Sequence, residues 1–157
     1  MILAGDIGGT NTRLGIFTPE RGPDDPIAQK TYRSQAYAGL EQIVRSFLDE
    51  HQASVTRASI GVAGPIKKNQ ARITNLPWTV DGRALQRRFG WRGARLLNDL
   101  EAVAWGVGAL GPGQVAELHA GDPEARGNAC VVAAGTGLGE AGMYWDGSRH
   151  HPFAGEG

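Results

Sequence analysis

Residues 6–13 read Asp6-Ile7-Gly8-Gly9-Thr10-Asn11-Thr12-Arg13 and lie between two short apolar runs, residues 2–5 and 14–17. The runs have the length and composition of buried strands, and two adjacent glycines permit a tight reversal of the chain between them. The sequence therefore predicts a β-hairpin whose turn carries a carboxylate, two glycines and several hydrogen-bond donors.

Such a turn can bind phosphate. Backbone N–H groups in a glycine turn can point at an anion, and Gly8 and Gly9 carry no Cβ that would block it. Thr10 and Asn11 add side-chain donors, and Asp6 could hold a magnesium ion, through water. The alternative is a purely structural turn that an acidic residue caps. A second site is needed to choose between these interpretations.

Composition narrows the classes of ligand. The chain has 157 residues, with 16 basic and 16 acidic side chains, so its formal net charge is zero. This balance gives no electrostatic reason to expect nucleic acid or an acidic membrane as a partner, and a small ligand is expected instead. The single cysteine, Cys130, suits a reducing compartment. Without a secretion signal or an apolar run of membrane-spanning length, we expect a cytoplasmic protein.

Strand and helix patterns alternate along the chain, which predicts an α/β fold with a mixed sheet and flanking helices. Glycine and proline cluster at residues 106–113. We therefore expect a small α/β domain at residues 1–110 and the start of a second domain at residues 111–157. The predicted strands are 28–33, 57–63, 70–74, 94–97, 115–118, 128–134 and 143–145; the predicted helices are 37–48, 81–89 with Asp81 as N-cap, and one that follows Asn98-Asp99.

Asn98-Asp99 is the second candidate site, because it lies where a predicted strand ends and a helix begins. Side chains at this position project into the crevice at the carboxyl edge of a sheet. The helix N-terminus favours negative charge, so Asp99 could accept a proton from a sugar hydroxyl as that oxygen attacks phosphorus. Asn98 can donate and accept hydrogen bonds, as a polyol requires. The alternative is that Asp99 only caps the helix.

Residues 133–139 form a third candidate, a turn of small residues after an apolar strand with Thr136 between Gly135 and Gly137. It could contact a terminal phosphate. The dinucleotide-binding spacing G-x-G-x-x-G occurs at residues 137–142 and 106–111, but neither run follows a strand and opens a helix. No G-x-x-x-x-G-K-[ST] run is present, which argues against a P-loop enzyme.

Taken together, these segments resemble the N-terminal half of the bacterial glucokinase family, an ATP-dependent group within the actin, Hsp70 and sugar-kinase superfamily. The similar segments occur in the family's order and cover nearly the whole chain. They are residues 6–13 (first phosphate motif), 61–66 (strand and turn near the sugar), 74–78 (sugar loop), 97–99 (catalytic aspartate), 135–139 (second phosphate motif) and 155–157 (start of the glutamate-containing sugar motif).

The resemblance implies an actin-like ATPase (ribonuclease H-like) fold and transfer of the ATP γ-phosphoryl group to the 6-hydroxyl of glucose, with ATP and Mg²⁺ as cofactors. It implies Asp99 as the catalytic base and Asp6 as the magnesium residue, through water. The other implied roles are sugar binding by Asn75, Asn98, Asp99 and Glu156, and phosphate binding by Gly8, Gly9, Thr10, Asn11, Gly135, Thr136 and Gly137.

Two alternatives stay open at this point: a kinase for fructose, mannose or an N-acyl hexosamine, and a non-catalytic sugar-binding regulatory protein. The family pattern continues beyond Gly155-Glu156-Gly157 with further sugar, adenosine and helical segments. We therefore expect the 157-residue chain alone to be an incomplete portion with weak or no activity. Self-association into a homodimer could cover apolar surface.

Overall fold

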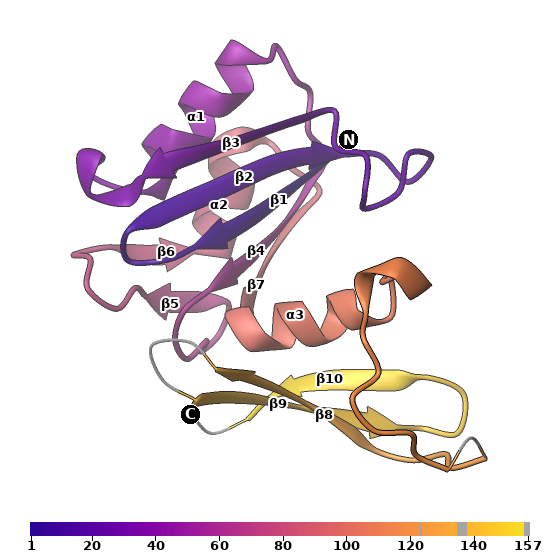
Figure 1. Cartoon of the computed structure of the whole chain (residues 1–157). Coiled ribbons are helices and arrows are strands. Elements are labelled where there is room, and N and C mark those ends of the chain that lie inside the picture. Colours follow the sequence, from indigo (N-terminus) through magenta and orange to yellow (C-terminus); the bar gives the residue numbers. More distant parts are fainter. Residues whose placement is uncertain (123, 135–137, 156–157) are drawn as a thin grey trace. The chain divides into compact units, whose positions relative to one another are not determined.

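The computed structural model describes residues 1–122, 124–134 and 138–155 (Figure 1). The chain forms two compact units, Met1–Asp99 and Leu100–Gly157, and each is described by itself. The predicted domain division after residue 110 stays a prediction.

A five-stranded sheet organises the first unit. Its strand order is β3-β2-β1-β4-β7. β1 pairs antiparallel with β2, which pairs antiparallel with β3, whereas β4 and β7 run parallel to β1. The predicted N-terminal hairpin and mixed sheet are thus confirmed, with longer hairpin strands than the apolar runs indicated. The bounds are β1 (Ile2–Ile7), β2 (Asn11–Phe17), β3 (Ala28–Arg33), β4 (Arg57–Val62) and β7 (Gly93–Asn98).

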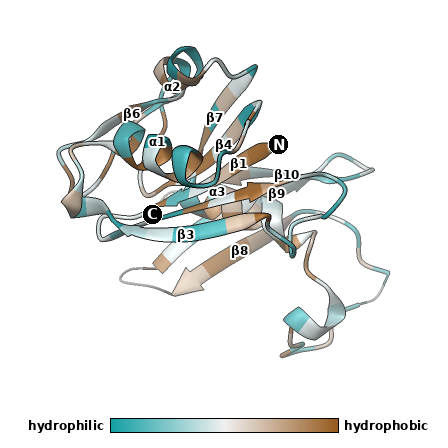
Figure 2. Cartoon of the chain, turned by 90° about the horizontal axis from the view of Figure 1, so that it is seen from above, coloured by the Kyte–Doolittle hydropathy of each residue, from teal (hydrophilic) through white to brown (hydrophobic). Residues whose placement is uncertain are grey.

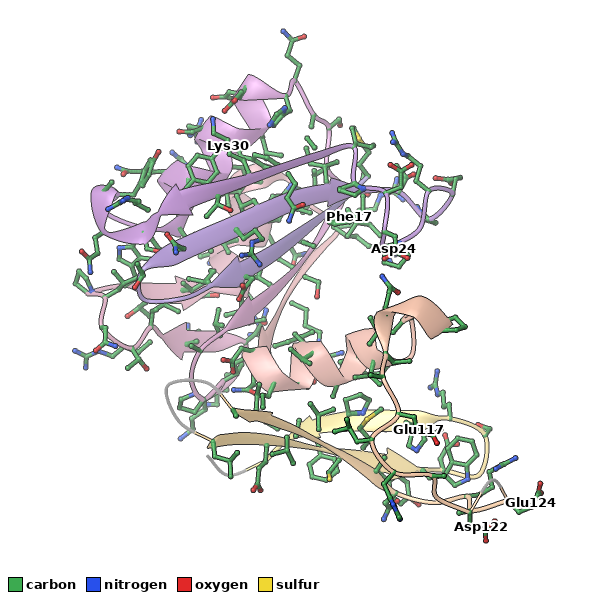
Figure 3. The ribbon with its side chains drawn as sticks, viewed as in Figure 1. Phe17, Asp24, Lys30, Glu117, Asp122 and Glu124 are labelled. Atoms are coloured by element: carbon green, nitrogen blue, oxygen red, sulfur yellow. The ribbon has the colours of Figure 1, made fainter. Side chains whose placement is uncertain are left out.

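Two amphipathic helices pack on this sheet, α1 (Leu40–Glu50) and α2 (Gly82–Phe89). Asp81 caps α2 as predicted, because its carboxylate accepts hydrogen bonds from the backbone N–H groups of Arg83 and Ala84. The helix predicted from residue 37 begins three residues later, because residues 37–39 form a bend and Gly39 at the N-cap is extended. Figure 3 shows Lys30 of β3 beside α1, where its ammonium group pairs with Glu50.

The core of the first unit lies between the helices and one face of the sheet. Alternate strand residues point to this face, such as Leu3 and Ile7 of β1, while Asp6 points to the other. α1 contributes Ile43 and Phe47, both fully buried. Figure 2 shows hydrophilic and apolar residues alternating along α1, as expected for a helix with one buried face.

A short hairpin joins β4 to α2. The sequence predicted its first strand, at residues 70–74, but not its second. It consists of β5 (Gln70–Arg72) and β6 (Thr79–Asp81). Asn69, at its start, has a left-handed backbone with φ 64°. Its side-chain amide donates to the carbonyl of Ala94 at 2.9 Å and accepts from the N–H of Leu96 at 2.8 Å. Asn69 therefore ties the hairpin to the edge strand β7.

The second unit contains an antiparallel three-stranded sheet of order β10-β9-β8. Its strands are β8 (Ala129–Ala134), β9 (Leu138–Trp145) and β10 (His150–Ala154); α3 (Asp99–Val107) precedes them. The strand predicted at residues 115–118 is wrong: the segment is irregular, and Val115 and Leu118 are 58% and 97% exposed. An apolar run without a neighbouring strand to pair with does not form a sheet.

A small core holds the second unit together. Ala104 of α3 packs with Ala141 and Met143 of β9. The segment before β8 is polar, and Figure 3 shows the acidic side chains of Glu117, Asp122 and Glu124 along it. No helix in the described part of the chain is both long and apolar enough to span a membrane.

Candidate active site

The ends of three parallel strands bring the candidate residues to one edge of the first sheet. In the strand register Ile7 of β1 lies beside Val62 of β4, and Val62 lies beside Asn98 of β7. Neighbouring strands are about 4.8 Å apart, so the ends of β1 and β7 are separated by roughly 10 Å. Residues that follow these strands directly, including Gly8 and Asp99, therefore meet at this edge.

The glycine turn, residues 8–11, connects β1 to β2 at this edge. The N–H of Gly8 donates to the carbonyl of Asn11 at 2.9 Å, which closes the turn. Asp6 lies directly opposite Arg13 in the antiparallel register, and both side chains are exposed. Cross-strand partners have Cβ atoms about 5 Å apart, so a carboxylate and a guanidinium group share this face beside the turn.

The glycine turn touches the loop that carries Asn75. A Cβ placed on Gly9 would lie 3.1 Å from the carbonyl oxygen of Thr74 and 3.3 Å from the Cβ of Asn75. Asn75 itself has a left-handed backbone, with φ 65°. Asparagine adopts this conformation more readily than most residues. The absence of a side chain at Gly9 therefore lets the loop pack against the turn.

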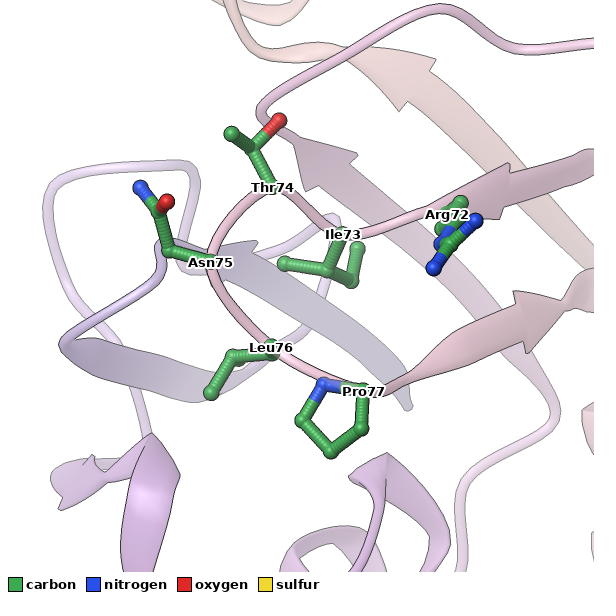
Figure 4. Close-up of a pocket in the computed structure, with 6 residues that line it drawn as sticks. All are labelled: Arg72, Ile73, Thr74, Asn75, Leu76 and Pro77. Carbon is green, nitrogen blue, oxygen red and sulfur yellow. The ribbon is translucent and has the colours of Figure 1, made fainter.

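A pocket of about 500 Å³ opens on this loop. Figure 4 shows the side chains of Thr74 and Asn75 pointing away from those of Leu76 and Pro77. The pocket thus offers a hydroxyl, an amide and the guanidinium group of Arg72, together with apolar side chains. Its lining residues are Arg72, Ile73, Thr74, Asn75, Leu76 and Pro77. Polar groups beside apolar side chains are typical of sites for small polar ligands.

Asn98, at the end of β7, is connected to this loop through Gly64. Its side-chain amide donates to the carbonyl of Gly64 at 3.4 Å. Gly64 has φ 135°, and a Cβ there would lie 3.5 Å from the carbonyl oxygen of Arg72. Gly64 thus packs between Asn98 and the pocket loop, in a backbone conformation that favours glycine. Asp99 follows as the first residue of α3, at its electropositive N-terminal end.

The structure thus brings together most of the predicted site residues. Gly9 contacts the Asn75 loop, Gly64 links that loop to Asn98, and Asp99 comes next along the chain. Gly135, Thr136, Gly137 and Glu156 lie outside the described residues, and their assignments stay predictions.

The sequence did not point to Ser34 or to the inward side of Thr12. Both are fully buried, and their hydroxyl oxygens are 3.0 Å apart. Ser34 also donates to the carbonyl of Gly8 at 3.0 Å. Ser34 is 26 residues from Gly8 in sequence, so no local pattern marks this contact. The one available signal in the sequence is that Thr12 lies in the glycine-rich segment, residues 6–13.

The residues present fit a phosphate-bound magnesium ion rather than a protein cage for a metal. Among the described residues no group of three or more His, Cys, Asp or Glu side chains could hold an ion. Asp6 offers a single exposed carboxylate beside the glycine turn. Mg²⁺ at phosphate sites usually keeps several waters and takes one or two carboxylates plus phosphate oxygens. One carboxylate next to a phosphate turn meets that requirement.

Comparison with known proteins shows the family to which the chain is similar. The family model described as glucokinase matches residues 3–157. The glucokinase of Nostoc punctiforme is 35% identical over 159 residues, covering 100% of this chain and 47% of the relative. That of Yersinia pestis (strain Pestoides F) is 35% identical over 155 residues, covering 99% and 47%. The chain thus spans about half the length of the curated relatives it matches.

Solved structures show the same fold. A glucokinase from an Antarctic psychrotroph superimposes with a TM-score of 0.85 at 29% identity, covering 99% of this chain and 50% of that one. A ROK family glucokinase from Streptomyces griseus, in complex with glucose and AMPPNP, gives 0.62 at 22% identity, covering 96% and 46%. The fold is therefore the actin-like ATPase fold of these sugar kinases. The chain belongs to the glucokinase family.

Proposed function

We propose that the protein containing this chain transfers the γ-phosphoryl group of ATP to the 6-hydroxyl of glucose, giving glucose 6-phosphate. One observation carries the proposal: the strand register places the glycine turn and Asn98-Asp99 on one sheet edge, and Gly9 packs against the Asn75 loop. A phosphate turn, a polar pocket and a carboxylate at one edge are what phosphoryl transfer to a sugar requires.

Asp99 is the proposed base. Its carboxylate accepts the proton of the 6-hydroxyl as the O6–Pγ bond forms and the bond from Pγ to the β–γ bridging oxygen breaks, so that ADP leaves. Asp99 directly follows β7 as the first residue of α3, so it lies at the sheet edge that carries the glycine turn.

The neighbouring residues orient the sugar. The amides of Asn75 and Asn98 hydrogen-bond its hydroxyl groups, and Glu156 is proposed for the same role from the family motif. Asn98 already donates to the carbonyl of Gly64, which restricts its rotamer before the sugar binds. A restrained side chain loses less entropy on binding, so this contact favours a defined orientation of the sugar.

The glycine turn holds the phosphates, through Gly8, Gly9, Thr10 and Asn11, and the segment Gly135-Thr136-Gly137 is proposed as the second phosphate contact. A bound Mg²⁺ ion would neutralise phosphate charge, and Asp6 would hold it through water. Arg13, opposite Asp6, adds positive charge on the same face. We further propose that the protein acts in the cytoplasm, in glycolysis.

A coupled assay of ADP release tests the function. The protein encoded by the complete gene is assayed with MgATP and glucose, fructose, mannose and N-acetylmannosamine, alongside its Asp99→Ala variant. We expect turnover with glucose, and a loss of kcat of at least about a hundredfold in Asp99→Ala with the Kd for glucose within a few fold. Comparable turnover by the variant would contradict the role of Asp99, and preference for another hexose would correct the substrate.

A further inference from the structure

Ser34 holds two carbonyl groups of the glycine turn from its buried side. Its backbone N–H donates to the carbonyl of Thr10 at 2.9 Å, and its hydroxyl donates to the carbonyl of Gly8 at 3.0 Å. Ser34 lies in the 3₁₀ turn that follows β3 and is fully buried. One residue outside the turn therefore fixes the direction of two of its peptide groups.

The hydroxyl of Thr12 completes this cluster. Its oxygen lies 3.0 Å from that of Ser34, and it is fully buried as well. Ser34 has a single hydroxyl proton, which goes to the carbonyl of Gly8. Thr12 must then be the donor of the Thr12–Ser34 bond. The order of donation is Thr12 to Ser34 to Gly8, and each hydroxyl in this buried cluster has a partner.

The direction of the Gly8 carbonyl sets the direction of the next N–H group. In a trans peptide the C=O of one residue and the N–H of the next point to opposite sides, and the chain contains no cis peptide in its described part. Because the Gly8 carbonyl points inward to Ser34, the N–H of Gly9 points outward from the buried cluster. That is the side on which a phosphate can approach the turn.

We infer that Ser34 is a positioning residue for phosphate binding, which acts through the Gly8–Gly9 peptide and is supported by Thr12. The inference rests on the proposed function, since it names how the phosphate side of that site is held in shape. Without the Ser34 hydroxyl, the Gly8 carbonyl loses its inward partner and the peptide can rotate its oxygen toward the anion. A carbonyl oxygen there repels phosphate, whereas the N–H group attracts it.

Steady-state kinetics of the full-length protein test the inference with Ser34→Ala and a matched control, Ser46→Ala. Ser46 is an exposed residue of α1 outside the site. We expect Ser34→Ala to raise the KM for MgATP about tenfold, the effect of one lost hydrogen bond, and to leave the KM for glucose within about twofold. Ser46→Ala should match the wild type. An unchanged KM for MgATP, or equal rises for both substrates, would overturn the inference.

Thr12→Val and Thr12→Ser give a second test if Ser34→Ala does not fold. Valine has nearly the shape of threonine but cannot donate, so Thr12→Val should raise the KM for MgATP, by less than Ser34→Ala. Thr12→Ser keeps the donor and should restore the wild-type value. A Thr12→Ser defect as large as that of Thr12→Val would show that packing, and not the hydroxyl, matters, and would overturn the inference.

The amide resonance of Gly9 separates this inference from the proposed function. Wild-type protein is titrated with MgATP and followed by NMR. A shift of the Gly9 resonance that Ser34→Ala weakens supports the inference, even if no hexose is phosphorylated and the proposed function fails. No shift in the wild type overturns the inference. If the wild type and Ser34→Ala bind MgATP and turn over equally well, the inference about Ser34 is wrong and the proposed function is kept.

Discussion

Gly9 packs closely against Thr74 although 65 positions of sequence separate them: a Cβ on Gly9 would lie 3.1 Å from the carbonyl oxygen of Thr74. The contact joins the proposed phosphate turn to the pocket loop. Such a distance is shorter than most real Cβ contacts, so any side chain at position 9 displaces one of the two segments.

Gly9→Ala should therefore impair phosphate and sugar binding together. We expect kcat/KM to fall about tenfold for both MgATP and glucose, because the added methyl group pushes the turn and the loop apart. Gly93→Ala is the matched control, since nothing lies within 4 Å of a Cβ there. Steady-state kinetics with each substrate varied in turn give the measurement. A defect confined to MgATP would show that the contact with Thr74 does not connect the two sites.

Asn75 can be tested without straining its loop, because glycine also tolerates its left-handed backbone. Asn75→Gly should raise the KM for glucose about tenfold through loss of the amide, with little change in the KM for MgATP. Asn75→Ala loses the same amide and adds backbone strain of about 1 kcal/mol. Urea denaturation should then show Asn75→Ala as the less stable of the two. Normal glucose kinetics in Asn75→Gly would remove Asn75 from the site.

Asn69 should be a strong determinant of stability, because its amide makes two hydrogen bonds to β7. Asn69→Ala leaves the carbonyl of Ala94 and the N–H of Leu96 without these partners. We expect a loss of about 2–3 kcal/mol in the free energy of unfolding. Asn69→Gly is the control for strain, since glycine tolerates the left-handed backbone of this position, with φ 64°, but lacks the amide. A free energy of unfolding close to that of the wild type in Asn69→Gly would point to backbone strain instead of the hydrogen bonds.

The β9–β10 hairpin should weaken in acid. The hydrogen bond from His151, followed by those from Arg149 N–H and Ser148, holds the pKa of Asp146 well below its usual range. A carboxyl group with a lowered folded pKa stabilises the structure above its unfolded pKa, near 4, and this contribution is lost as pH falls toward the folded pKa. The protection factors of the amides in residues 145–151, which correct for the intrinsic pH dependence of exchange, should therefore fall below about pH 4. The variant Asp146→Asn should lose this pH dependence; if the protection factors fall unchanged in the variant, another group is responsible.

The sequence predicted the main sheet well, because buried strands and amphipathic helices leave clear apolar patterns, although β1 and β2 extend beyond the apolar runs. It was less informative where pairing depends on distant residues. The three-residue strand β6 is too short for a pattern, and Pro152 lies within β10. The run at residues 115–118 has the composition of a strand but no partner strand in the described part of the chain.

In the candidate site, too, the residues marked by local patterns were predicted and the contacts between distant segments were not. Glycines, Asn98 and Asp99 were recognisable because each follows a predicted strand, where functional groups gather. The contact of Gly9 with Thr74 and the buried bond between Thr12 and Ser34 depend on how separate segments pack. A single sequence does not record such packing, so these contacts required the structure.

The Thr12–Ser34 pair has an evolutionary consequence. A substitution of Ser34 alone leaves the buried hydroxyl of Thr12 without an acceptor, and a substitution of Thr12 alone removes the group that orients Ser34. Each single substitution therefore lowers stability, and the second substitution reverses that loss. Among related sequences we expect the two positions to vary together, either both bearing hydroxyl groups or both small and apolar, so that ancestral lineages changed them as a unit.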